Sequence, residues 1–261
     1  MKKLSRQIYD EITKQLDFNS LPGITLPEII LRINHIMHDD MANAEDLVLA
    51  IRADELLSTR ILRISNAPAL RGNYKTIALA ESVLHLGMTT IRNLAISLSF
   101  IDHVRGQKSK FTTLIEDELA ACVERAVVGC ILSNITTGLM AESAIVVGLI
   151  GRIGQIVTIL FIASSENYST IDQEKVLSIA NEIGNALSDK ILSSWDFPSG
   201  IVDAVVSKTS ANLLNPVTYQ DISALADAYI GHTLPAEKYE EIELILLHYE
   251  EDSIGLRSLL R

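Results

Sequence analysis

The sequence predicts an all-α protein, and three observations support that fold class. Glycine (13) and proline (6) are scarce in a chain of 261 residues, which favours long helices over a sheet rich in turns. Apolar residues recur every three to four positions along most of the chain. No alternating apolar and polar run is long enough to predict a strand. Because 48% of the residues are hydrophobic, the chain can bury a sizeable core, as one large domain or two small ones.

The N-terminal region predicts two helices joined by a turn-rich link. Apolar residues spaced four apart form the buried face of the first helix: Leu4, Ile8, Ile12 and Leu16. The link follows at residues 20–27, and Pro27 suits the first turn of the next helix, with Thr25 or Leu26 just before it. That helix has five apolar residues on one face: Ile29, Ile30, Ile33, Ile36 and Met37.

Capping residues mark the next two helices. Asn43 or Ala44 begins a short helix with an acidic first turn, which suits the helix dipole. Asp54 is the expected N-cap of the following helix, because an aspartate side chain can accept hydrogen bonds from the first free backbone amides. We expect that helix to end near Asn66.

Two further helices complete the first half of the chain. Thr76 is the expected N-cap of a helix that stops at Gly87. A longer helix is expected from Thr89 to about His103. The polar, glycine-containing bridge at 105–110 is then the best boundary inside the chain.

Helices are expected through the rest of the chain as well. Their expected ranges are 112–137, 144–163, 172–193, a helix opened by Pro198, 218–232 and 236–249. Asp172 is the expected N-cap of its helix, and residues 195–198 turn the chain before Pro198.

The most apolar run, residues 144–163, could be a membrane span or a buried helix. Its length of about 20 residues is enough to cross a bilayer. However, a central arginine such as Arg152 costs roughly 2.5–3.5 kcal/mol there. Gly148, Gly151 and Gly154, spaced three apart, would let another helix approach closely. We therefore predict a buried central helix and no membrane association.

Charge and cysteine content exclude several classes of function. The formal net charge is −11, from 22 Lys+Arg against 33 Asp+Glu, and an acidic surface repels phosphate backbones, so we expect no nucleic-acid partner. Cys122 and Cys130 lie in apolar surroundings and are expected to be reduced core residues. The first residues lack the apolar segment of a signal peptide, so we expect a cytoplasmic protein.

Three segments resemble the HDOD domain family. The first joins residues 26–30 to 53–67, the second is Ile77–Leu94, with its Leu-Gly pair and Arg-Asn-Leu, and the third is Trp195-Asp-Phe-Pro198. The resemblance covers roughly Leu21 to Tyr229. It implies an HD-like all-α fold, related to metal-dependent HD phosphohydrolases, that usually serves signalling and regulation rather than catalysis.

The signature residues of the N-terminal segments have structural readings that identify the fold rather than an active site. Asp54 is an N-cap, Asn66 a turn residue at a helix end and Gly87 a helix stop. Arg60 is a solvated or locally paired charge.

The same resemblance allows a test for catalysis. An HD phosphohydrolase needs histidines and a His-Asp pair that converge on metal ions. In this chain the doublet aligns with Gly151-Arg152, and the upstream histidine aligns near Arg125. The remaining ligands align at Ala180 and near Lys208-Thr209. None of these side chains is a metal ligand at neutral pH, so we expect no catalytic residue, no metal and no cofactor.

The basic residues at these positions have two readings. If Arg125, Arg152 and Lys208 converge, they could bind a small anion. Alternatively they pair with buried carboxylates such as Glu124 or Asp203.

A literal His-Asp doublet occurs elsewhere, at His38-Asp39, with His35 one turn before it. A metal site would need both histidines and Asp39 or Asp40 on one face, with further donors nearby. Exposed His and Asp at a helix end are more commonly solvated caps, and we favour that reading.

These observations predict a non-catalytic, bacterial-type signalling module that binds a partner protein, on a surface between its two lobes. The expected organisation is an N-terminal helix (1–20), an HDOD domain (21–230, with lobes at about 21–105 and 111–230) and a C-terminal helical extension (231–261). The rival reading is a divergent phosphohydrolase acting on a nucleotide. A bound metal ion would distinguish this phosphohydrolase from the non-catalytic module.

Overall fold

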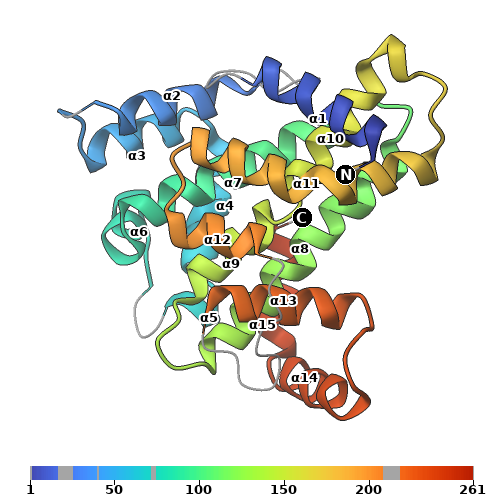
Figure 1. Cartoon of the computed structure of the whole chain (residues 1–261). Coiled ribbons are helices and arrows are strands. Elements are labelled where there is room, and N and C mark those ends of the chain that lie inside the picture. Colours follow the sequence, from blue (N-terminus) through green and yellow to red (C-terminus); the bar gives the residue numbers. More distant parts are fainter. Residues whose placement is uncertain (1, 17–25, 40, 72–74, 208–217, 261) are drawn as a thin grey trace.

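The structure is a computed structural model that describes residues 2–16, 26–39, 41–71, 75–207 and 218–260 (Figure 1). Within these residues every regular element is a helix, so the predicted all-α class is confirmed. The fold has the expected HD-like form. Shorter helices of the N-terminal lobe lie beside a C-terminal lobe built around long helices.

Seven helices form the N-terminal part of the chain. Their bounds are α1 Lys3–Gln15, α2 Glu28–Met37, α3 Ala44–Arg52, α4 Glu55–Ser65, α5 Pro68–Arg71, α6 Leu79–Leu86 and α7 Met88–Arg105. The short α5 was not predicted from the sequence. The first helix packs mainly on α11 (Gln173–Ser194), a helix of the C-terminal lobe.

The C-terminal lobe follows from residue 112. Its elements are α8 Thr112–Asn134, α9 Ala141–Ile150, α10 Ile153–Ser164, the 3₁₀ turn Glu166–Tyr168, α11, α12 Ser199–Val206, α13 Tyr219–Ile230, α14 Ala236–His248 and α15 Glu250–Leu260. Sequence analysis placed the last helix at 236–249 and missed α15. This helix packs on both α8 and α4, so the C-terminal end of the chain contacts both lobes.

Capping explains where several helices begin. Asn43 and Asp46 form a reciprocal capping box at α3, and Asp172 caps α11 by accepting from the Lys175 amide. The expectation for Thr76 is wrong. The residue before α6 is Ala78, while Thr76 is buried and bonded to Asn66 instead.

The apolar run at 144–163 is not one helix as predicted. It is divided into α9 and α10 by a turn at Gly151-Arg152. Together Ala141–Ser164 are long and apolar enough to cross a membrane, yet 94% of the most apolar window is buried inside the protein. This stretch therefore lies in the buried core of the protein.

Glycines allow the close packing of this central segment, as predicted. A Cβ on Gly148 would lie 2.2 Å from the Ala126 nitrogen of α8, and one on Gly154 would lie 1.9 Å from the Gly184 oxygen of α11. Both contacts are with backbone, which cannot move aside as a side chain can. The two helices are therefore held against different neighbours, α9 on α8 and α10 on α11.

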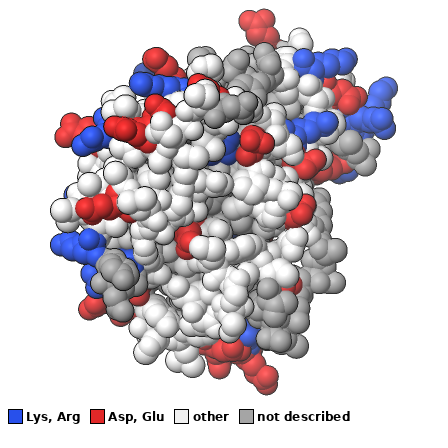
Figure 2. Space-filling view, turned by 90° about the vertical axis from the view of Figure 1, so that its left-hand side faces the viewer, with Lys and Arg blue, Asp and Glu red and all other residues white. Residues whose placement is uncertain are grey.

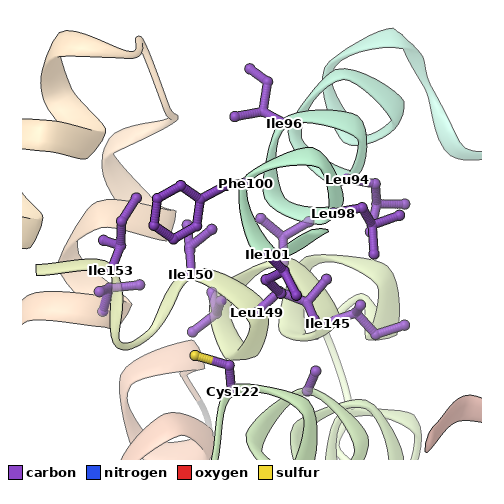
Figure 3. Packing of buried hydrophobic residues seen from close by; sticks show 14 of the residues in the cluster. Leu94, Ile96, Leu98, Phe100, Ile101, Cys122, Ile145, Leu149, Ile150 and Ile153 are labelled. Carbon is purple, nitrogen blue, oxygen red and sulfur yellow. The ribbon is translucent and has the colours of Figure 1, made fainter. Parts of the chain in front are cut away.

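The core extends from α7 across α9 to α8. In Figure 3, Phe100 and Ile101 of α7 face Ile150 and Leu149 of α9, and Cys122 of α8 lies on the other side of α9. Both cysteines are free and buried. Burial raises the pKa of each thiol to about 12, so they act as small apolar core residues, as the sequence predicted.

Candidate functional site

Asp54 and Asn66, two of the predicted signature residues, hold the two ends of α4. Asp54 accepts a hydrogen bond from the Leu57 amide at 2.9 Å. Asn66 accepts from the Thr76 amide at 2.9 Å and donates to the Thr76 and Leu62 carbonyls, each at 2.8 Å. Asn66 thereby fastens the segment before α6 to the end of α4. Both contacts are structural.

Arg60 has a longer-range role than its sequence context indicated. It is 9% exposed and forms an ion pair with Asp102 of α7. Its Nε and Nη2 donate to the carbonyls of Leu259 and Leu260, each at 3.1 Å. Those carbonyls belong to the last turn of α15, where backbone acceptors have no helical partner. Arg60 therefore fastens α15 to the N-terminal lobe.

Gly87 both ends α6 and begins α7. Its φ is +83°, in the left-handed region that side chains disfavour. A Cβ there would meet nothing within 4 Å. The backbone conformation, and not crowding, therefore requires glycine at this position.

Arg92 joins the second signature segment to the third. It is 1% exposed and donates to the carbonyls of Trp195 and Asp196, the latter at 3.1 Å. It also donates to the side-chain oxygens of Asn34 on α2 (3.0 Å) and Asn93 (2.7 Å). One guanidinium thus connects α2, α7 and the turn before α12, which is where the two lobes meet.

The surroundings of Arg92 keep it charged while burying it. Burial lowers its pKa to about 10, and the Asp196 carboxylate partly offsets that effect. The guanidinium also lies 5.3 Å from the centre of the Phe197 ring, a favourable cation–π geometry. Arg92 and Trp195 both belong to the family signature in the sequence, but no contact between them was predicted.

A pocket of about 360 Å³ opens in the C-terminal lobe, where the HD-type ligands were aligned. It lies at the break between α9 and α10 and is bounded by α8, α11, α12 and α13. Its lining residues are Arg125, Gly151, Arg152, Gln155, Asn185, Val205, Ser207, Ser223, Ala224, Asp227, Ala228 and Thr233. The structure therefore brings Arg125 and Arg152 to one site, while Lys208 lies outside the described residues.

Arg125 is the buried cation of this pocket. It is 5% exposed, and its Nη1 and Nη2 donate to Asp227 Oδ1 and Ser223 Oγ of α13, each at 2.7 Å. A Cβ on Gly151 would lie 2.8 Å from the Arg125 Cζ. The guanidinium therefore occupies the space that Gly151 leaves open.

Arg152 is held more loosely. Its Nε lies 3.5 Å from Glu118 Oε2, which is an ion pair by charge but too long for a good hydrogen bond. Glu118 is 7% exposed. Burial raises the pKa of this carboxyl, and Arg152 and Arg125 lower it less than burial raises it.

The predicted carboxylate partners of the two arginines are wrong. Glu124 accepts from Arg257 of α15 at 2.9 Å, and Asp203 is exposed on α12. The partners are instead Asp227 and Glu118, of which Glu118 precedes Arg125 by seven residues. That spacing puts Glu118, Cys122 and Arg125 on one face of α8, a signal that the sequence analysis overlooked.

The donor set does not fit a divalent metal. Arg125, Gly151, Arg152 and the buried Ala180 supply none of the oxygen, imidazole or thiolate ligands that such ions take. Among the described residues, three or more His, Cys, Asp or Glu side chains are nowhere grouped as a metal site requires. His35 and His38 are exposed, and His38 Nδ1 lies 2.8 Å from the Asn34 carbonyl.

Unpaired buried polar atoms gather at this pocket. Nine buried side-chain nitrogen or oxygen atoms in the described residues have no hydrogen-bond partner, and four of them belong to Glu118, Arg125, Arg152 and Gln155. Buried polar atoms without partners are uncommon and call for an explanation. Three of the other five belong to Asn34, Arg92 and Trp195 where the lobes meet, so such atoms gather at two places in the described structure.

A second feature is a broad surface with few charges on the side of α2, α3 and α6. Figure 2 views this side, and charged side chains lie mostly around its margin. Helices α3, α4 and α6 pack against one another and carry exposed aliphatic side chains: Leu49, Leu56 and Leu84, with Ile77 just before α6.

Comparison with known families supports the resemblance found in the sequence. The family model of the HDOD domain matches residues 24–211. No curated protein is significantly similar to the chain in sequence.

Solved structures share the fold at low sequence identity. A candidate metal-dependent phosphohydrolase from Shewanella amazonensis SB2B has a TM-score of 0.69 at 16% identity, with both chains covered completely. An HDOD domain protein of unknown function from Geobacter sulfurreducens has a TM-score of 0.57 at 14% identity, covering 99% of this chain and 97% of that one. A candidate signal transduction protein from Marinobacter aquaeolei VT8 gives 0.53 at 15% identity, covering 98% and 65%.

Proposed function

Because this chain belongs to the HDOD domain family, we propose that it is a non-catalytic regulatory module that binds a partner protein. The observation that carries the proposal is the replacement of metal ligands in the C-terminal lobe. By the sequence resemblance, arginine and glycine stand where an HD phosphohydrolase needs imidazole and carboxylate. In the structure the arginines pair with carboxylates, Arg125 with Asp227 and Arg152 with Glu118.

Loss of the ligands removes the chemistry, because HD-type hydrolysis depends on a metal to polarise the phosphoryl oxygen and generate hydroxide. A guanidinium can stabilise a phosphoryl oxygen but cannot deprotonate water at neutral pH. The two cysteines offer no nucleophile either, since their thiols are buried and protonated. We therefore propose that this protein acts by binding another molecule and not by catalysis.

The N-terminal lobe supplies the surface for that binding. Five of the ten exposed large hydrophobic side chains of the described residues lie between Met41 and Leu84. Several of these side chains stand on α3, α4 and α6, which pack against one another, and exposed apolar side chains grouped in this way favour a protein interface. The junction of the lobes, the expected place for a partner, is filled by Arg92 and Trp195, so we propose a docking surface on α3, α4 and α6 instead.

Partner capture with surface variants tests this placement. The full chain, immobilised, is used to capture proteins from a lysate of its own host, and captured proteins are identified by mass spectrometry. Leu84→Asp changes a side chain that is 85% exposed, and Leu244→Asp on α14, 67% exposed, is the matched control. We expect Leu84→Asp to lose a protein that both the parent and Leu244→Asp retain.

Thermal melts of each variant serve as the control for folding, and we expect them to match the parent. Equal capture by Leu84→Asp, Leu56→Asp and the parent would remove the N-terminal surface from the proposal. If instead Leu244→Asp alone lost the partner, the interface would lie on the C-terminal helices.

The alternative function is a divergent metal-dependent phosphohydrolase acting on a nucleotide. The Shewanella protein, which shares the fold over its whole length, is described as a candidate metal-dependent phosphohydrolase, and this supports the alternative. Metal content and hydrolysis by the purified chain separate the two functions.

A further inference from the structure

We propose that the pocket around Arg152 binds a small oxyanion, specifically the phosphate group of a phosphate monoester. This goes beyond the regulatory function and does not depend on it, because the pocket and the exposed face of α3, α4 and α6 involve different residues.

Arg152 has an N–H donor that is free to bind a ligand. Its side chain is 29% exposed and lines the pocket, and its Nε, which lies 3.5 Å from Glu118 Oε2, has no hydrogen-bond partner in the described residues. It also stands immediately before α10, a helix of 12 residues whose first turn contributes Gln155 to the pocket. Helix N-termini favour anions because their free amides and dipole point toward the ligand.

Arg125 provides the second, independent observation. It is 95% buried, and its Nη atoms are engaged by α13, but its Nε has no partner. The contacts with Asp227, Ser223 and Gly151 fix its guanidinium in the wall of the pocket. A cation that is already ordered and desolvated loses little entropy when an anion arrives.

Asp227 and Glu118 balance the formal charge of these two arginines only while Glu118 is ionised, and burial raises the pKa of Glu118. Glu118 is buried and its Oε2 accepts no hydrogen bond. Groups that face it are Arg152 at the α9–α10 turn, Arg125 and Asp117 on α8, and Asp227 on α13. An oxyanion beside Arg152 would favour the protonated form of Glu118, which could then donate a hydrogen bond to the ligand.

Size and lining indicate an ester rather than a bare ion. A volume of about 360 Å³ falls at the lower end of the range for small-molecule sites, roughly 300–1,000 Å³. The unpaired Gln155 Oε1 can accept from a hydroxyl of the ligand. Asn185, Ser207 and Thr233 add further polar groups to the lining. These features suit a phosphate attached to a small hydroxylated body.

Calorimetric titration with ribose 5-phosphate tests the proposal, with ribose and inorganic phosphate as companions. We expect ribose 5-phosphate to bind, phosphate to bind more weakly and ribose not to bind. Arg152→Ala should weaken binding of ribose 5-phosphate about 10- to 100-fold, the effect of losing charge-assisted hydrogen bonds. Arg63→Ala, which removes an exposed arginine of α4, should leave the affinity unchanged.

The Glu118→Gln variant provides a second test, because this substitution should not weaken binding in the pocket. Removing the competing carboxylate should keep or increase the affinity for ribose 5-phosphate. The proposal is overturned if ribose 5-phosphate does not bind at millimolar concentration. It is also overturned if Arg152→Ala binds as the parent does, or if Glu118→Gln binds more weakly. None of these outcomes bears on partner capture.

Discussion

Replacing Arg92 by alanine should destabilise the protein strongly, because this side chain connects three segments where the lobes meet. It is fully buried and has four acceptors: Asn34 Oδ1, Asn93 Oδ1 and the carbonyls of Trp195 and Asp196. The substitution leaves these acceptors without their donor and opens a cavity the size of a guanidinium beside Phe197.

The magnitude follows from the acceptors that stay buried. Leaving a buried polar group unpaired costs about 1–3 kcal/mol, and three of the four acceptors are buried. Water entering the new cavity would restore some of these bonds, so we expect a loss of about 3–5 kcal/mol, similar to breaking a buried ion pair. At roughly 2–4 °C per kcal/mol for a chain of this size, the melting temperature should fall by about 6–20 °C.

Thermal unfolding followed by circular dichroism measures this effect. Arg63→Ala is the control, since an exposed helical arginine should change stability by less than about 0.5 kcal/mol. Arg92→Lys should fall between the parent and Arg92→Ala, because an ammonium cannot bond to all four acceptors at once. A melting temperature for Arg92→Ala within 2 °C of the parent would refute the role given to this residue.

Three further predictions concern buried residues of α8 and α10. Gly154→Ala should reduce stability by several kcal/mol or prevent folding, because its Cβ would lie 1.9 Å from the Gly184 oxygen, whereas Gly200→Ala on α12, with nothing within 4 Å, should be close to neutral in the same urea titration. Cys122 and Cys130, with pKa values of about 12, should resist iodoacetamide at pH 8 in the folded protein and react fully in urea, and alkylation of both thiols without denaturant would contradict their burial. Since burial raises the pKa of Glu118 in the folded state, its ionisation opposes folding above the unfolded pKa of about 4.3. The melting temperature of Glu118→Gln should therefore exceed that of the parent at pH 7 and approach it as the pH falls toward 4. A lower melting temperature than the parent at pH 7 would show that ionised Glu118 stabilises the fold and would contradict this prediction.

The fold was predictable from the sequence wherever local signals decide structure. Asn43, Asp54 and Asp172 begin helices because their side chains bond to amides two or three residues away. Thr76 has the same chemistry, but Asn66 engages its backbone and the helix begins later. A neighbour ten residues away therefore overrode the local capping signal.

The break of the central apolar run depends on a distant residue as well. The sequence predicts one helix through Gly151 and Arg152, because every local neighbour is apolar or helix-forming. In the structure, the Arg125 guanidinium of α8 lies where a side chain at position 151 would be. Periodicity along the chain carries no information about that contact.

The candidate site was predictable by position but not by pairing. Alignment with the HD pattern singled out Arg125 and Arg152 as residues that could converge, and both line one pocket. Their partners Asp227 and Glu118 come from different helices, so the sequence pointed to the wrong carboxylates. Arg60 illustrates the same limit, since its carbonyl partners lie 199 and 200 residues away, in a helix that was not predicted.

The central claim is that the pocket of the C-terminal lobe cannot support metal-dependent hydrolysis. Its most direct test is metal analysis of the full chain after incubation with Mn²⁺, Fe²⁺ or Ni²⁺ and removal of excess ion, combined with a nucleotide hydrolysis assay on the same sample. We predict far less than one bound ion per chain and no hydrolysis above the metal-only control. One or two tightly bound ions per chain, together with hydrolysis that a chelator abolishes, would contradict the claim.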